Sequence, residues 1–125
     1  MRTAIDAAII NEGKILLVKK KETWILPGGK PKLGESDLEC LCREVHEELS
    51  GTELQNFMYY GKFKGKSPHT GDIVHVKVYL ADIKGEIYGA SAEIVASEWA
   101  KEPRNYNLSE ITAEIINSLI RDNYL

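Results

Sequence analysis

Glutamates are concentrated in one short segment of this chain, directly after the glycine pair Gly28-Gly29. Five fall in the 14 positions from 35 to 48, with Arg43 among them: Glu35, Glu39, Glu44, Glu47 and Glu48. Crowded carboxylates repel one another unless something positive binds between them. Hard divalent cations such as Mg²⁺ prefer oxygen ligands of this kind. Whatever fold the chain adopts must therefore present these side chains to a cation or to solvent.

The segment from Ser36 to about Leu49 is predicted to be a helix. Ser36 and Glu39 make an S-x-x-E capping box at its start. An apolar stripe follows at spacings of three and four residues, and it consists of Leu38, Leu41, Cys42, Val45 and Leu49. One face of this helix is therefore expected to pack in the core.

Three glutamates of this helix share one side of it. Because a helix advances about 100° per residue, Glu44, Glu47 and Glu48 fall within an arc of about 100° and form one acidic patch. Like charges at i and i+4, such as Glu44 and Glu48, weaken a helix, and a bound Mg²⁺ would reverse that penalty. A solvated acidic face is the simpler interpretation of these three residues alone. Their combination with the preceding glycine pair, glutamate and arginine favours a metal site.

The whole segment resembles the Nudix box, G-x5-E-x7-R-E-U-x-E-E-x-G-U, where U is a bulky aliphatic residue. Beginning at Gly29, the matching positions are Glu35, Arg43, Glu44, Val45, Glu47 and Glu48. The chain departs from the pattern at Ser50 and Gly51, where the family has glycine and an aliphatic residue. Glycine commonly ends a helix in a left-handed conformation, and Gly51 is expected to do so one residue later.

The resemblance implies roles for the residues of the box. Glu44, Glu47 and Glu48, together with the backbone carbonyl of Gly28, are the expected ligands of Mg²⁺, which Mn²⁺ can replace. Arg43 is expected to pair with a box glutamate and hold it in place; an ordinary surface ion pair is the alternative.

The general base stays open between three glutamates. Glu44 is the candidate inside the box. Glu93 lies six residues before Trp99, in a loop where the family often has a metal ligand or base, and Glu98 competes with it. An exposed loop carboxylate is the alternative for both. The predicted catalytic residues are Arg43, Glu44, Glu47, Glu48 and Glu93.

Substrate contacts are predicted mainly outside the helix. The resemblance places Lys19 and Gly29 at the substrate, although Lys19 belongs to a lysine run that is equally well interpreted as a solvated charge cluster. Asn107 is expected to cap the final helix or to read a base edge. Pro68 lies near the position where a proline marks ADP-ribose hydrolases, but a proline in a glycine-rich loop is commonplace.

Alternating and apolar runs surround the predicted helix. Strands are expected at 3–10, 14–19, 24–26, 54–64, 72–83, 87–88 and shortly after Glu93, with a hairpin turn at 11–13 and a final helix capped by Asn107 or Ser109. Strands on both sides of one helix, then a closing helix, predict an α/β fold with a mixed β-sheet between helices. The resemblance sharpens this to a Nudix-type α/β/α sandwich of the MutT-like kind, in a single domain spanning residues 1–125.

Composition limits the partners. The chain has 125 residues and a net charge of −3, which lacks the basic footprint of a nucleic-acid polymer partner. No stretch is long enough to cross a membrane. Cys40 and Cys42 point roughly 200° apart on a helix, so they cannot form a disulfide, and a reducing cytoplasm is expected. Cys42 is expected in the core and Cys40 nearer the acidic face. A monomer or homodimer fits this composition.

The resemblance implies Mg²⁺-dependent hydrolysis of a phosphoanhydride bond in a nucleoside diphosphate derivative. The MutT-like layout favours a nucleoside triphosphate, including oxidised or non-standard ones, cleaved to a monophosphate and pyrophosphate. An ADP-ribose or nucleotide-sugar pyrophosphatase is the alternative enzyme. A non-catalytic nucleotide sensor is the alternative of another class, but such a protein would be expected to lose box glutamates.

Overall fold

The computed structural model describes residues 2–67, 69–89 and 93–125, so Pro68 lies outside the described residues. The strands are β1 (Arg2–Asn11), β2 (Lys14–Lys20), β3 (Thr23–Ile25), β4 (Gly28–Gly29), β5 (Ser50–Lys66), β6 (Ile73–Gly89) and β7 (Ile94–Ala100). The helices are α1 (Asp37–Glu48), the short 3₁₀ helix η1 (Pro103–Asn105) and α2 (Glu110–Arg121).

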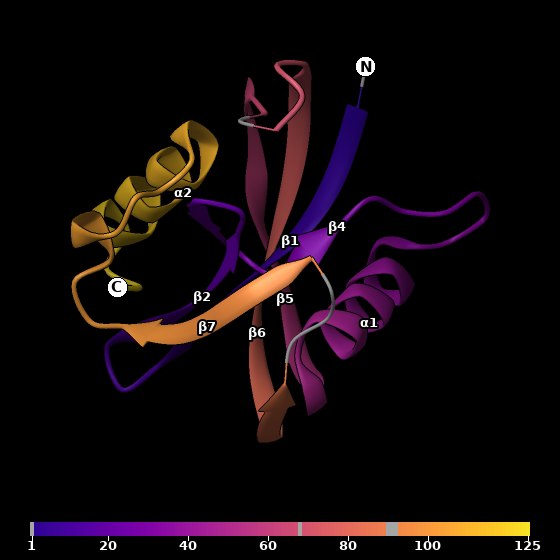
Figure 1. The fold of residues 1–125 in the computed structure, drawn as a ribbon, viewed down its shortest axis with the longest axis horizontal. Coiled ribbons are helices and arrows are strands. Elements are labelled where there is room, and N and C mark those ends of the chain that lie inside the picture. The colour runs from indigo at the N-terminus through magenta and orange to yellow at the C-terminus, as the bar shows by residue number, and fades with distance from the viewer. Residues whose placement is uncertain (1, 68, 90–92) are drawn as a thin grey trace.

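The strands form a mixed sheet with the order β3-β2-β1-β6-β5, in which β4 also pairs with β1 and β7 with β2. The β1–β6 pairing is parallel, and the other strand pairings are antiparallel. Figure 1 shows α1 and α2 on opposite sides of this sheet. The prediction of a mixed sheet between helices is confirmed.

The elements begin and end where local chemistry dictates. Glu12 and Gly13 both have positive φ, 52° and 75°, as a two-residue hairpin loop of the I′ type requires between β1 and β2. Ser36 caps α1 with both hydrogen bonds of the predicted capping box. The cap of α2 is Ser109, so Asn107 is not the cap; the Asn107 amide instead donates to the carbonyl of Glu22 at 2.8 Å.

The sheet separates two apolar cores. On the α1 side, residues such as Ile5, Leu41 and Val45 pack together, and on the α2 side Val78, Ile115 and their neighbours do so. Pairing between β1 and β2 is limited to the hairpin end, where Ile10 pairs with Ile15 and Asn11 with Lys14. Beyond these pairs the two strands separate, which leaves space between the β1–β4 region and the β2–β7 region.

Three details differ from the sequence predictions. Cys40 is buried and Cys42 is exposed, the reverse of the expected arrangement. Leu49, and not Gly51, is the C-cap of α1. Gly51 has a positive φ of 91°, but it lies at an irregularity of β5, packed against Tyr88. The strands β5 and β6 also extend well beyond their predicted ends, because their alternation continues through the glycine-containing stretches.

Candidate active site

One cavity of about 470 Å³ lies where β1 and β2 separate, at the end of the sheet that α1 approaches. Its inner wall contains the three carboxylates of Asp6, Glu44 and Glu48 and the backbone of the Gly28-Gly29 pair. Polar side chains from β2, from the β5–β6 connection, from the residue before β7 and from the start of α2 line the remainder, and they include Lys20, Ser67, His69, Glu93, Ser109 and Thr112. The cavity therefore joins the predicted acidic site to a larger pocket.

The glycine pair is held between β1 and α1. Gly28 pairs with Asp6 and Gly29 with Ile5 in the β1–β4 ladder. A Cβ atom at Gly29 would lie 2.6 Å from Glu44 Oε2, and one at Gly28 would lie 2.5 Å from Asp6 Oδ1. Any side chain at these two positions would collide with a carboxylate, which is a structural reason for the two glycines. It adds to the turn that the sequence indicated.

Glu48 is anchored at the inner wall by the same pair. Its Oε1 accepts a hydrogen bond from the backbone N–H of Gly28 at 3.0 Å. Burial, together with the nearby charges of Asp6 and Glu44, raises the pKa of Glu48 to about 8, against the lowering effect of the Gly28 hydrogen bond. An opposite charge beside this carboxylate would stabilise its ionised form.

Arg43 fixes Glu44 to the loop that precedes α1. Its guanidinium donates to both oxygens of Glu35, at 2.7 and 2.9 Å, and to the backbone carbonyl of Lys30 at 3.0 Å. The same group donates to Glu44 Oε1 at 2.6 Å. The Arg43 hydrogen bonds lower the pKa of Glu35 to about 2. The prediction that Arg43 pairs with box glutamates is confirmed, and a forked donor of this kind gives directional as well as ionic restraint.

Asp6 is the site residue that sequence reasoning missed. It lies in the middle of β1 between the buried residues Ile5 and Ala7. Burial and the charge of Glu44 raise the pKa of Asp6 to about 8. The available signal was the single acidic side chain in an otherwise apolar strand, which in a buried strand indicates a partner or a function.

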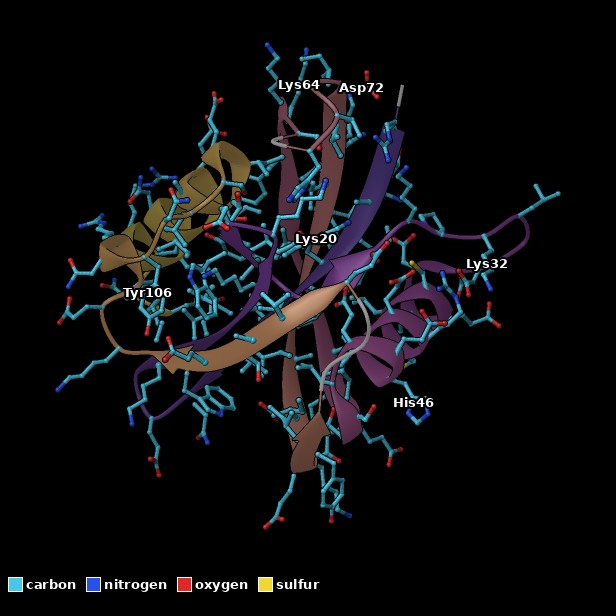
Figure 2. The ribbon with its side chains drawn as sticks, viewed as in Figure 1. Lys20, Lys32, His46, Lys64, Asp72 and Tyr106 are labelled. Carbon is cyan, nitrogen blue, oxygen red and sulfur yellow. The ribbon has the colours of Figure 1, made fainter. Side chains whose placement is uncertain are left out.

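The outer part of the cavity carries one ion pair across its mouth. Lys20 Nζ lies 3.6 Å from Glu93 Oε2, and the Glu93 side chain is 76% exposed. A ring nitrogen of His69 lies 3.4 Å from the backbone carbonyl of Lys20. Figure 2 shows Lys20 near the centre of the molecule, in contrast to His46 at the outer surface of α1. Lys20 is thus the member of the lysine run 19–21 that lines the cavity.

Other predicted residues lie elsewhere: the described residues that line the cavity do not include Glu47, Lys19, Asn107 or Glu98. The Glu47 side chain is 54% exposed, with Oε2 3.7 Å from Arg43 Nη1. The ammonium of Lys19 lies 5.9 Å from the centre of the Trp24 ring. Asn107 and Glu98 line separate surface hollows. Of the three candidates for the general base, Glu44 and Glu93 therefore reach the cavity.

The donor chemistry of the inner wall suits a hard divalent cation, since it consists of carboxylates and backbone oxygens. Within residues 2–67, 69–89 and 93–125, no three acidic, histidine or cysteine side chains are already close enough together to hold an ion. The carboxylates would therefore have to move closer together to share one ion. Burial in the first place, and the charges of neighbouring carboxylates in the second, raise the pKa values of Asp6 and Glu48, and a bound cation would offset both effects.

A family model described as NUDIX domain matches residues 1–116. The chain belongs to this family, and it is of the MutT-like kind. The crystal structure of a MutT NUDIX hydrolase from Burkholderia pseudomallei superposes with a TM-score of 0.79 at 28% identity, covering 93% of this chain and 95% of that one.

Two relatives with named activities are also similar. The m7GpppN-mRNA hydrolase of Saccharomyces cerevisiae is 31% identical over 92% of this chain, which spans only 13% of that protein. The ADP-ribose pyrophosphatase of Methanocaldococcus jannaschii is 27% identical over 86% of this chain, which spans 63% of that protein. No helix among the described residues is long and apolar enough to cross a membrane.

Proposed function

We propose that this protein hydrolyses a phosphoanhydride bond of a nucleoside triphosphate, releasing a nucleoside monophosphate and pyrophosphate with the help of Mg²⁺ or Mn²⁺. The observation that carries the proposal is the placement of Glu44 and Glu48 on the wall of a cavity large enough for a small ligand, in a chain that has every charged position of the box. A protein that only senses nucleotides has no need to keep this charged set complete.

The chain's own residues divide the work of such a reaction. Glu44 and Glu48 would hold the ion, and the box implies Glu47 and the carbonyl of Gly28 as further ligands. A bound divalent ion supplies a more acidic water and neutralises charge on phosphate oxygens. Arg43 orients Glu44 through its fork to Glu35.

Proton removal and phosphate binding fall to other residues that line the cavity, or to Glu44 in a second role. Glu93 or Glu44 is the group that takes the proton of the attacking water, since both line the cavity. Lys20 is placed to bind a phosphate, which would displace Glu93 from its 3.6 Å ion pair. Lys19, Gly29 and Asn107 remain predicted substrate contacts by resemblance.

The proposed partners are small. A nucleotide, rather than a nucleic-acid polymer or a membrane, fits the chain's net charge of −3. The two free cysteines, Cys40 and Cys42, fit a reducing cytoplasm. A monomer or homodimer is proposed for the oligomeric state.

A second candidate is hydrolysis of ADP-ribose or a nucleotide sugar. The similarity to the ADP-ribose pyrophosphatase of M. jannaschii favours it. The same inner wall would serve, because the bond attacked is again a phosphoanhydride, and only the group in the outer cavity would differ. The yeast relative adds a capped dinucleotide to the compounds worth testing.

A substrate panel tests the proposal. Purified protein with Mg²⁺ is incubated with standard and oxidised nucleoside triphosphates, ADP-ribose, nucleotide sugars and a cap dinucleotide, and products are separated by ion-exchange chromatography. Nucleoside monophosphate with pyrophosphate is the expected pair. Cleavage confined to ADP-ribose would select the second candidate. Tight nucleotide binding in calorimetry without any turnover would instead support a sensor.

A further inference from the structure

Asp6 occupies a position where a charged side chain is costly. It lies on β1, an inner strand, where it pairs with Gly28 of β4 on one side and Val78 of β6 on the other. Its chain neighbours Ile5 and Ala7 are completely buried. The Asp6 carboxylate consequently meets solvent through the cavity that it lines. An ionised group in such a place needs a partner.

Among the described residues, none donates a hydrogen bond to the carboxylate of Asp6, and none forms an ion pair with it. Its Oδ1 is instead packed against Gly28, whose N–H donates to Glu48. Asp6 and Glu48 thus both contact Gly28, while Glu44 contacts the adjacent Gly29. All three carboxylates therefore lie beside one short stretch of backbone.

This arrangement distinguishes Asp6 from Glu47. The box predicts Glu47 as a ligand, but its side chain is half exposed and lies beside Arg43, outside the cavity. Asp6 comes from the middle strand of the sheet, and it lines the cavity together with Glu44 and Glu48.

We propose that Asp6 is a further protein ligand of the divalent metal ion, and that it completes the carboxylate set with Glu44 and Glu48 on the inner wall. The inference rests on the metal requirement of the proposed function, and it adds a residue from outside the Nudix box. A carboxylate that repels its neighbours when alone becomes favourable when a cation binds among all three.

The test compares Asp6→Asn with two matched variants, Glu47→Gln and Asp82→Asn. Asp82 is an exposed aspartate on β6 that accepts a hydrogen bond from Asn56. Binding of Mn²⁺ is measured from the electron paramagnetic resonance signal of the free ion, and melting temperature is measured with and without Mg²⁺. Neither readout depends on turnover.

For Asp6→Asn we expect a melting temperature in chelator equal to or above that of the unaltered protein, because a buried carboxyl that is costly to ionise is replaced by a neutral amide. We also expect Mn²⁺ affinity to fall by about tenfold or more, at least the loss seen when a residue that merely orients a metal ligand is replaced. Glu47→Gln should lose less affinity than Asp6→Asn, and Asp82→Asn none. A purely structural Asp6 predicts the opposite pattern, a lower melting temperature with unchanged affinity.

Each failure has a separate meaning. If the unaltered protein bound no Mn²⁺, the metal requirement of the proposed function would fail, and the Asp6 proposal with it. If it bound Mn²⁺ and Asp6→Asn bound equally well, the Asp6 proposal alone would be overturned. Should Asp6→Asn not fold, Asp6→Ala provides the same comparison with a side chain that suits an apolar strand.

Discussion

The two helices of this protein have the same length and the same kind of N-cap, but they are held by different forces. Both α1 and α2 contain 12 residues and begin after a serine cap, Ser36 and Ser109. The α1 helix buries three of its residues, Cys40, Leu41 and Val45. The α2 helix buries six, namely Ile111, Thr112, Ile115, Ile116, Ser118 and Leu119. Twice as much of α2 is therefore fixed by packing.

Polar contacts replace the missing packing around α1. Arg43 joins it to Glu35 in the preceding loop, and its first residue Asp37 accepts hydrogen bonds from Lys77 and Tyr79 on β6, the latter at 2.7 Å. Glu44 and Glu48 of the same helix line the cavity. The difference indicates that α2 mainly stabilises the sheet by packing. Fewer side chains of α1 are buried, and two of its glutamates line the cavity.

The largest expected effect separates the two helices by function. Replacing Glu48 with Gln keeps an acceptor for the Gly28 N–H but removes the charge that would hold the ion. Turnover should fall by about a thousandfold, because a bound metal ion contributes several kcal/mol to such a reaction. Urea unfolding in chelator should show stability equal to or above that of the unaltered protein. An active Glu48→Gln enzyme would remove Glu48 from the metal site.

Shortening one buried side chain of α2 should lower stability and leave turnover unchanged. Ile115 is fully buried, and Ile115→Ala should lower the free energy of unfolding by about 2–5 kcal/mol through lost burial and a cavity. Turnover per folded molecule, measured well below the melting temperature, should stay close to that of the unaltered protein. If Ile115→Ala left stability intact but abolished turnover, the division of roles between the helices would be wrong.

Sequence reasoning worked where a local pattern determines the outcome. The capping box at Ser36, the turn at Glu12-Gly13 and the ion pair between Glu35 and Arg43 each depend on residues close in sequence. The mixed sheet between helices also followed, since strand runs flank the helix on both sides. The box resemblance supplied the family before any tertiary contact was known.

The remaining features depend on how elements pack. Cys40 lies one turn before Glu44, and its Sγ donates toward the carbonyl of Gly29 at 3.6 Å. Contact with β4, rather than the apolar stripe of the helix, therefore decides which cysteine is buried. The register of β2 against its neighbours decides that Lys20 and not Lys19 lines the cavity. Asp6 joins the glutamates only through the β1–β4 pairing. No local pattern contains that information.

An intermediate effect concerns the polar network of α1. Lysine at position 43 keeps the charge but loses the fork that holds Glu35 and Glu44 together. We expect Arg43→Lys to weaken Mn²⁺ binding by roughly 10–100-fold, as for other residues that orient metal ligands. The matched control is Arg104→Lys, whose guanidinium donates two hydrogen bonds to Asn117 on α2. Equal affinities in both variants would show that Arg43 does not position Glu44.

The smallest effects come from the caps, and they test the comparison most directly. Ser36→Ala should cost about 1 kcal/mol of unfolding free energy, as an ordinary lost N-cap does. Ser109→Ala should cost about 2 kcal/mol, because buried Ser109 also donates from its Oγ to the Thr112 hydroxyl at 2.7 Å, which would lose its partner. Adding Thr112→Val to Ser109→Ala should recover part of that difference, since no buried hydroxyl is then left unpaired. Urea titrations of the four proteins measure the set. If Ser36→Ala proved the costlier change, the cap of α2 would not depend on its buried surroundings more than the cap of α1 does. The contrast between the two helices would then rest only on how many of their side chains are buried.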